Sequence, residues 1–404
     1  MKLLKNSKTG IKSIWQDTHK RMGLIQFIIF VFIIYIVALL TTNILNSLAN
    51  LDMSISFRFL KNPSHINIGE SIIDVKNSSS FLRIIFAGFI NTISITVVAI
   101  FFSTFIGIFI ALCRLSSNWL IKKIAIIYIE IIRNIPLLLL LLIWYRAFFL
   151  KLPGVKTSFA VGKKVSSDGI TSLKLSISNR GLSMVWLKPT EHFNPWLICI
   201  LIGFILSIVL IVYLKRREKI TGKEQRTIVY PLLLFIAFAL LSYFILPEKA
   251  LYKDVPILGK FNISGGLHIT AEWFSLFSGL VLYTSGFIAE IFRSGIQGVP
   301  KGQIEAARAL GLSHRQTIRL VIIPQAKVVI IPPLTSQFLG VAKNTSLGVA
   351  IGFPDMFAIT GTIINQTGRT LEMILLIMSV YLILSLITSF FMNRYNKKVQ
   401  LKER

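Results

Sequence analysis

The stretch PKGQIEAARALGLSHRQTIRLVIIP occupies residues 300–324 and separates two apolar segments of the chain. Pro300 favours the start of a helix, and residues 303–310 are dense in good helix formers. Gly311 is typical of the position that follows a helix C-terminus. The first half of the stretch therefore predicts one short polar helix that ends at a sharp turn.

A second short helix is expected after the turn. Ser313 with Gln316 three residues later matches a capping box, and Pro324 disturbs the helix where the next apolar segment begins. Alanines at positions 306, 307 and 309 carry minimal side chains, so another surface can approach the first helix closely. The pattern predicts a bent pair of helices suited to meeting a partner.

The same turn matches two other structures. Ala307 followed by Gly311 is typical of a DNA-binding helix-turn-helix, and an ordinary amphipathic loop also fits. A recognition helix must reach the major groove, whereas this one is tied at both ends to apolar segments. The context disfavours nucleic-acid binding.

Composition places the chain in a membrane. Apolar residues make up 54% of its 404 residues, charged residues only 15%, and the mean hydropathy is +0.71; a soluble domain carries about 25% charged residues. Roughly 20 apolar residues in a helix span the hydrocarbon core, and lipid admits only helices or closed barrels. Because the apolar runs are long and uninterrupted, we predict an all-α polytopic membrane protein.

About eight transmembrane helices are expected. Five windows hold no charged residue: 24–45, 84–113, 195–214, 227–246 and 373–392. Three less clean candidates are 273–289, which is slightly short, and 124–149 and 328–352, which contain charged residues. The first run is too long for a cleaved signal peptide and is expected to be retained. The loop at 151–194 shows little helical periodicity and is expected to be an external cap or a mobile segment.

The net charge of +27 is explained by topology. Of the 44 Lys and Arg residues, 26 lie in five segments, 1–21, 113–123, 215–226, 293–330 and 393–404. Another 15 lie in the four alternate loops, 46–83, 151–194, 247–272 and 353–370, which have far more residues per charge. Basic loops remain in the cytoplasm. Both termini are therefore predicted to be cytoplasmic, which agrees with an even number of spans.

At this point the central stretch resembles a known motif. Glu305, Ala306 and Ala307, then Gly311, then Pro324 reproduce the spacing of the "EAA" loop of ABC importer permeases. Two apolar positions of that loop hold different apolar residues here: Val321 stands at the isoleucine position and Ile323 at the leucine position. In the family, the loop forms the coupling helix that docks on the ATPase subunit. The resemblance implies that Glu305, Ala306, Ala307, Gly311 and Pro324 form the coupling site.

Flanking residues are similar to those of the polar amino-acid uptake family. The resemblance covers most of 84–150 and 270–392, including the stretches around Glu130–Leu138, Tyr283–Arg293 and Lys343–Leu347. Length and layout resemble the general L-amino-acid permeases, which exceed the five-helix core of type I importers. The implied layout is a cytoplasmic N-terminus at 1–23, an extra first transmembrane helix at 24–45, a permease domain at 84–392 with an inserted loop and helix pair at about 151–246, a cytoplasmic coupling loop at 293–327 and a cytoplasmic tail at 393–404.

The resemblance also implies function and partners. It implies the permease subunit of an ATP-driven importer of amino acids, across a range of L-amino acids, in the bacterial inner membrane. Its partners would be an ABC ATPase dimer, a second and related heterologous permease chain, and a periplasmic amino-acid-binding protein. The chain would be a transport subunit and not an enzyme. It would carry no cofactor, since ATP and Mg would bind the ATPase.

Polar residues inside the expected helices are candidates for the substrate pathway. Ionisable groups there cost roughly 3 kcal/mol and usually face a partner or a cavity. Glu130 and Arg133 lie on one helical face and could neutralise each other, or the helix, broken near Asn134 and Pro136, could line the pathway. A polar group flanked by glycines suits a gate or a substrate contact; its members are Lys343, Asn344, Thr345 and Ser346.

Other polar residues have simpler interpretations. Glu290 and Arg293 are three residues apart, as Glu130 and Arg133 are, but lie at a helix end. We expect them to form an interfacial salt bridge. Asn91, Thr92, Ser94 and Thr96 favour helix packing.

The chain shows no power source of its own. It lacks a G-x-x-x-x-G-K-[ST] phosphate loop, and its two cysteines and five scattered histidines form no metal-ligand pattern. Two alternatives remain beside the importer: a self-powered secondary transporter that uses Glu130, Arg133 and Lys343 as a relay, and a membrane-embedded enzyme. No visible inverted repeat supports the first, and no reactive constellation supports the second.

Overall fold

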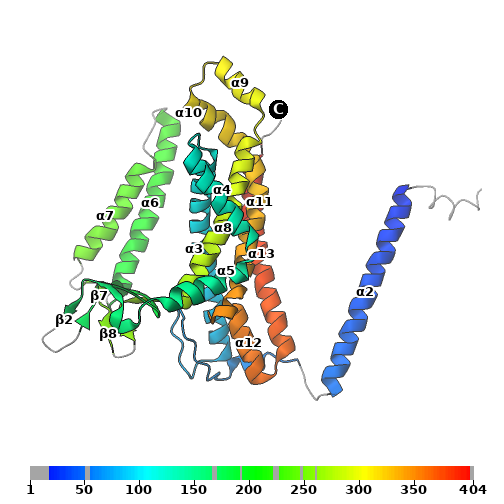
Figure 1. Cartoon of the computed structure of the whole chain (residues 1–404), viewed down its shortest axis with the longest axis vertical. Coiled ribbons are helices and arrows are strands. Elements are labelled where there is room, and N and C mark those ends of the chain that lie inside the picture. Colours follow the sequence, from blue (N-terminus) through cyan, green and yellow to red (C-terminus); the bar gives the residue numbers. More distant parts are fainter. Residues whose placement is uncertain are drawn as a thin grey trace, which may run out of the picture. The chain divides into compact units, whose positions relative to one another are not determined.

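The computed structural model describes residues 18–50, 55–165, 171–191, 193–221, 227–245, 249–259 and 262–400 (Figure 1). Most of the predicted N-terminal segment and the last four residues of the predicted tail lie outside this part. The chain divides into two compact units, residues 1–62 with 370–372, and residues 63–369 with 373–404.

The smaller unit contains one long helix, α2 (Thr18–Asn50), and a short 3₁₀ turn, η1 (Arg58–Lys61). Arg21–Ser47 of α2 is apolar and long enough to cross a membrane, in agreement with the predicted first helix. Within this unit the Ser56 backbone N–H donates a hydrogen bond to the Glu372 carboxylate at 3.2 Å.

The larger unit is organised around α3 (Phe81–Leu115), α8 (Ala271–Gln297) and α11 (Ile323–Asn344). Figure 1 shows α8 packed between the other two. Glycines permit this close approach: a Cβ on Gly107 of α3 would lie 2.6 Å from Ile288 of α8, and one on Gly295 of α8 would lie 2.3 Å from Ile330 of α11. Small residues at crossings are the usual device of membrane helices.

The outer face of α3 is apolar and exposed. Phe101, Phe105 and Phe109 follow one another at four-residue spacing and are 67%, 70% and 62% exposed. A stripe of large apolar side chains on one helical face is suited to lipid or to another membrane protein.

The predicted kink near Pro136 is confirmed. α4 (Trp119–Asn134) and α5 (Leu137–Ile143) form a helix pair bent by 104°. Ile135 has an extended conformation, φ −94° and ψ 127°, because a residue that precedes proline is disfavoured in the helical region. A π-helical turn, η2 (Trp144–Phe148), and a 3₁₀ turn, η3 (Phe149–Lys151), complete the segment.

Within the described residues, six helices are long and apolar enough to span a membrane, and the bent pair makes seven. These are Arg21–Ser47, Phe81–Leu115, Phe193–Glu218, Ala271–Gln297, His314–Ile351, Thr370–Val399 and the pair Trp119–Asn134 with Leu137–Lys151. The eighth predicted span corresponds to α7 (Val229–Ile245), an apolar helix of 17 residues. The helical membrane fold is confirmed, with one predicted span shorter than expected.

The inserted segment contains strands that the sequence did not predict. One antiparallel sheet has the order β1 (Phe159–Val161), β4 (Leu175–Ser178), β5 (Gly181–Met184), β10 (Leu267–Thr270). A second has the order β2 (Lys164–Val165), β3 (Thr171–Ser172), β8 (Ile257–Leu258), β9 (Ile263–Ser264), and β6 (Trp186–Pro189) pairs with β7 (Leu251–Asp254). A 3₁₀ turn, η4 (Val155–Thr157), precedes them. We call these strands the β cap.

The β cap joins the two sides of the insertion. Strands from residues 159–189 pair with strands from residues 251–270, and the helices α6 (Phe193–Thr221) and α7 lie between them in the chain. Gly181 pairs with Thr270 at a φ of +117°, and a Cβ there would meet the Ile269 carbonyl oxygen at 2.0 Å. Only glycine permits this register, which fixes the cap directly onto the start of α8.

The remaining elements close the bundle. η6 (Thr345–Ile351), α12 (Met356–Thr367) and α13 (Thr370–Val399) follow α11. The main hydrophobic core joins α3, α5, α8, α11 and η6 through buried side chains, which include Ile95, Leu141, Leu276, Val341 and Phe353.

Candidate coupling surface and transmembrane pathway

The first predicted helix of the central stretch is α9 (Lys301–Ala309). Its end is a Schellman cap: the Gly311 N–H donates to the Arg308 carbonyl at 2.9 Å, and the Leu312 N–H donates to the Ala307 carbonyl at 3.1 Å. Gly311 has φ +77°, a conformation that disfavours every residue with a Cβ. The predicted turn is therefore confirmed, and it has one defined geometry.

The second helix is α10 (His314–Thr317), and its predicted capping box is confirmed. The Gln316 backbone N–H donates to the Ser313 hydroxyl at 3.4 Å, and the Ser313 N–H donates to the Gln316 side chain at 2.9 Å. A π-helical turn, η5 (Ile318–Ile322), then leads into α11, whose first turn contains Pro324. We call α9, α10 and their turn the hairpin.

The hairpin is attached to the bundle on one side only. Ala307 is buried, and Val299 before α9 joins a core cluster with Ile330 of α11. The Gln325 side chain donates to the Gln303 side chain at 3.3 Å, which links α11 back to α9. Of the other predicted coupling residues, Glu305, Ala306 and Gly311 are exposed and Pro324 is half-buried.

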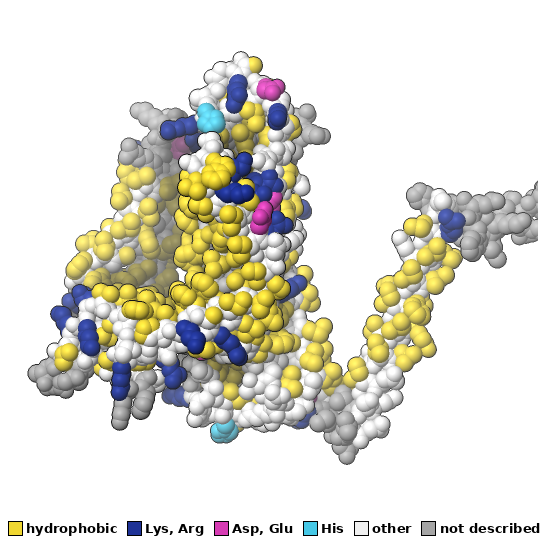
Figure 2. Space-filling model, in the orientation of Figure 1, with side chains coloured by type: hydrophobic (Ala, Val, Ile, Leu, Met, Phe, Trp, Pro, Cys, Tyr) yellow, Lys and Arg dark blue, Asp and Glu magenta, His cyan; other side chains and the backbone are white. Residues whose placement is uncertain are grey.

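The free side of the hairpin combines charge with one apolar contact point. Leu310 is 81% exposed. The hairpin and the η5 turn after it also expose one acidic side chain and several basic ones, Glu305, Lys301, Arg308, His314, Arg315 and Arg319. Figure 2 shows basic, acidic and histidine side chains over the hairpin at the top of the view, and mainly hydrophobic side chains over the helices below it. The exposed face of the hairpin is therefore mostly charged, and Leu310 is its most exposed large apolar side chain.

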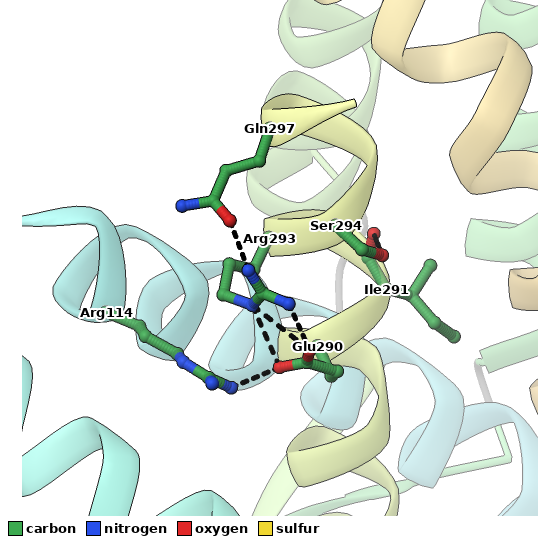
Figure 3. A network of polar contacts seen from close by, with 6 residues as sticks. All are labelled: Arg114, Glu290, Ile291, Arg293, Ser294 and Gln297. Carbon is green, nitrogen blue, oxygen red and sulfur yellow. Dashed lines mark hydrogen bonds and ion pairs between the residues drawn. The ribbon is translucent and has the colours of Figure 1, made fainter. Parts of the chain in front are cut away.

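A three-residue ion cluster connects α3 to the segment of α8 that leads to the hairpin (Figure 3). The Glu290 carboxylate accepts hydrogen bonds from the Arg293 guanidinium, with Nε at 3.1 Å from both oxygens, and forms an ion pair with Arg114 at the end of α3. Arg293 also donates to the Gln297 side chain. The predicted Glu290–Arg293 salt bridge is confirmed; Arg114 lies far away in the sequence, and no local spacing indicated it.

The predicted pathway residues on α4 lie on an uncovered face. Glu130, Arg133, Asn134 and Pro136 are all exposed in the isolated chain. The Arg133 guanidinium stacks over the Phe287 ring of α8 at 5.4 Å. Among the described residues no ion pair joins Glu130 to Arg133, so the structure does not form the pairing that was one of the two alternatives for them. The Arg133 guanidinium faces the Phe287 ring instead of the Glu130 carboxylate.

The second predicted group lies where α11 changes into the 3₁₀ turn η6. Lys343 is exposed, Asn344 and Ser346 are half-buried, and Thr345 is fully buried with its hydroxyl on the Ala342 carbonyl at 2.9 Å. Lys343 and Ser346 line a largely apolar cavity of about 640 Å³ against α13. In the described part of the chain Lys343 has no ion-pair partner.

The two groups of candidate pathway residues flank one hydrophobic core. Leu137 and Leu141, just after the break at Pro136, pack in the same cluster as Val341 and Ile351, which flank the group 343–346. The bend of α4 and α5 thus lies next to the place where α11 unwinds. Two broken helices that meet in a bundle are typical of a transport pathway.

The polar residues early in α3 have the expected packing role. The Asn91 side chain donates to the Glu70 and Pro354 carbonyls, both at 3.0 Å, and the Thr92 hydroxyl accepts from the Met356 N–H at 3.0 Å. They fasten the segment before α3 and the start of α12 to the bundle.

Fold and site together define a polytopic membrane protein that displays a fixed helical hairpin between two spans. Residues 227–401 match the family model described as "Binding-protein-dependent transport system inner membrane component". Proteins of this description are multi-pass permeases of the inner membrane, and the family typically carries no cofactor.

Full-length relatives narrow the class. The chain is 41% identical to the putative amino-acid ABC transporter permease protein YhdX of Escherichia coli, over 95% of each chain. It is 39% identical to the general L-amino acid transport system permease protein AapQ of Rhizobium johnstonii, over 98% of this chain and 96% of the relative. It is 34% identical to the glutamate/glutamine/aspartate/asparagine permease BztB of Rhodobacter capsulatus, over 96% of each. The chain belongs to the permeases of amino-acid ABC transporters; it is the membrane component and not the ATPase.

Proposed function

We propose that the chain forms one half of the pore of an importer for a range of L-amino acids and pairs with a related but different permease chain. The similarity to AapQ over nearly the whole length of both proteins supports the substrate range. The exposed apolar faces of α3 and α6 leave surface for a second membrane subunit. A periplasmic amino-acid-binding protein would deliver the substrate from outside.

The hairpin carries this proposal. One side of it is exposed, and the other side is held to α8 and α11. The C-terminus of α9 and the N-terminus of α10 are both capped. In the proposed complex Glu305, Ala306 and Leu310 contact the ATPase, Ala307 holds α9 to the bundle, and Gly311 and Pro324 set the bend. ATP-driven closure of two ATPases then moves α9, and the buried attachment passes the motion to α8 and α11.

The proposed orientation follows from the basic residues. The hairpin, the N-terminus and the C-terminal tail are cytoplasmic, and the β cap is periplasmic. The substrate then passes the bend at Asn134 and Pro136 and the group Lys343 to Ser346. Glu130, Arg133 and Lys343 supply charges for the zwitterionic ends of an amino acid.

The test reverses one charge on the hairpin. Glu305→Lys should abolish co-purification with the ATPase and reduce ATP-driven uptake of labelled amino acids, while membrane insertion and expression stay normal. Glu191→Lys is the matched control, because Glu191 is also exposed but belongs to the β cap segment. Full uptake by Glu305→Lys would contradict the docking role.

A second outcome separates the importer from a self-powered secondary transporter. The purified chain, reconstituted alone in vesicles, should accumulate no amino acid in the presence of ion or proton gradients. Accumulation without any hydrolysed nucleotide would favour the secondary transporter instead.

A further inference from the structure

A polar cavity lies at the other end of α8 from the hairpin. It has a volume of about 580 Å³ and is formed by the segment before α3, the end of the α5 segment, the β cap and the start of α8. Its chemically active lining residues are Glu70, Tyr145, Asn179, Arg180, His268 and Glu272. None of them is a predicted coupling or pathway residue.

One part of the lining is acidic. Glu272, in the first turn of α8, accepts a hydrogen bond from the Tyr145 hydroxyl at 2.7 Å. Glu70 accepts a hydrogen bond from the Thr270 hydroxyl, the N-cap of α8. Burial, with a smaller contribution from the nearby Glu272, raises the pKa of Glu70 to about 7. Both carboxyl groups are oriented by hydroxyl donors and retain further acceptor capacity.

Another part of the lining is basic and amide-bearing. Arg180 and Asn179 occupy the tight turn between β4 and β5. Arg180 is exposed, and the ion pairs of the described residues do not include it. Its fork of N–H donors matches a carboxylate in two contacts. His268 is bonded at Nδ1 to the Ser183 hydroxyl at 2.8 Å, and burial lowers its pKa, so the ring lines the cavity in its neutral form.

The elements that carry these groups are fixed to one another. β5 pairs with β10 along four residues, which sets Arg180 relative to His268 and Thr270. Asn91 of α3 holds the backbone of Glu70. The site is therefore held in place before any ligand arrives, which lowers the entropic cost of binding.

We propose that this cavity is an external binding subsite for a free amino acid in its zwitterionic form. Arg180 and Asn179 bind the α-carboxylate, and Glu272 with Glu70 accepts the α-ammonium group. The volume lies within the range of about 300–1,000 Å³ that small-molecule sites occupy. The choice of an amino acid rests on the proposed transport function.

The charge pattern selects against simpler ligands. A lone anion would meet two carboxyl groups, and a lone cation would meet the guanidinium of Arg180. A ligand that carries a positive and a negative charge close together pairs with Arg180 and with the two carboxyl groups at once. A ligand with a single charge leaves desolvated groups of the cavity unpaired, which lowers its affinity. The subsite lies where the β cap meets the start of α8, so it adds a binding step before the candidate pathway residues near Pro136 and Lys343.

The test measures binding without transport. The assembled transporter in lipid nanodiscs, without nucleotide and without binding protein, is incubated with radiolabelled L-glutamine. We expect saturable binding that unlabelled L-glutamine displaces and that equal concentrations of butyrate or butylamine do not. Arg180→Ala and Glu272→Gln should each weaken binding at least tenfold. Lys156→Ala and Glu191→Gln, exposed residues of the same region outside the cavity lining, should bind like the wild type.

Arg180→Lys guards against a folding defect, because it keeps the charge and should restore part of the affinity lost in Arg180→Ala. No binding to the wild type would overturn the subsite, as would binding that Arg180→Ala and Glu272→Gln leave unchanged but Lys343→Ala removes.

ATP-driven uptake is measured on the same preparations. Uptake by the wild type without cavity binding would overturn the subsite alone. A wild type that takes up no amino acid with its ATPase and binding protein present would overturn the proposed function, whatever the cavity binds.

Discussion

Removing the central charge of the ion cluster should destabilise the chain measurably. In Glu290→Gln the guanidinium groups of Arg114 and Arg293 lose their common carboxylate. Breaking a buried pair costs about 3–5 kcal/mol, and an exposed pair contributes about 0–1 kcal/mol. The three side chains are 23–24% exposed, between these limits. We expect a loss of about 2 kcal/mol in the free energy of unfolding, about 30-fold in the equilibrium constant.

The assay is reversible unfolding of the full chain in mixed micelles, titrated with a denaturing detergent and followed by circular dichroism. A double-mutant cycle of Glu290→Gln with Arg114→Gln should give a coupling of about 1 kcal/mol, because the two residues are in direct contact. Glu305→Gln is the control, since Glu305 is exposed and without an ion-pair partner among the described residues; it should change the free energy by less than about 0.5 kcal/mol. A coupling indistinguishable from zero would refute the structural role of the cluster.

Three further outcomes follow from particular residues. Gly311→Val forces a branched side chain to φ +77°, a strain of about 1–2 kcal/mol, and should lower ATP-driven uptake with normal expression, whereas Gly302→Ala inside α9 should not. Lys343→Ala should change uptake or stimulated ATP hydrolysis without loss of assembly; unchanged behaviour in both assays rejects a pathway role. Because the pKa of Glu70 is raised in the folded state, its stabilising contribution is complete below pH 4.5 and is lost as the pH rises through about 7. Unfolding of Glu70→Gln, measured beside the wild type from pH 4 to 8, should lack that decline; parallel profiles would contradict the burial of Glu70.

Local patterns predicted local structure well. The capping box at Ser313 and Gln316, the glycine turn at Gly311 and the break at Pro136 each depend on residues a few positions apart, and the structure forms all three. The Glu290–Arg293 pair belongs to the same class, since its partners are one helical turn apart. The spacing of such residues along the chain already determines their contact.

The remaining features depend on tertiary packing. Glu130 and Arg133 have the same helical spacing as Glu290 and Arg293, yet Arg133 finds the Phe287 ring of another helix. The β cap was missed because its strands are only two to four residues long and pair across the inserted helices α6 and α7. The cavity residues Arg180 and Glu272 are brought to one place by that pairing, so no motif along the chain joins them.

The helix α8 connects the polar cavity to the ion cluster. α8 runs without a break from Ala271 to Gln297, so Glu272 in the external cavity and Glu290 in the ion cluster are parts of a single rod about 40 Å long. Close contacts of glycines with α3 and α11 confine this helix sideways. If an amino acid in the proposed subsite shifts α8, we expect the helix to pass part of that shift to the hairpin. Coupling between two binding sites is reciprocal. If a bound amino acid changes the affinity of the hairpin for the ATPase by some factor, docking of the ATPase should change the affinity of the proposed subsite for the amino acid by the same factor.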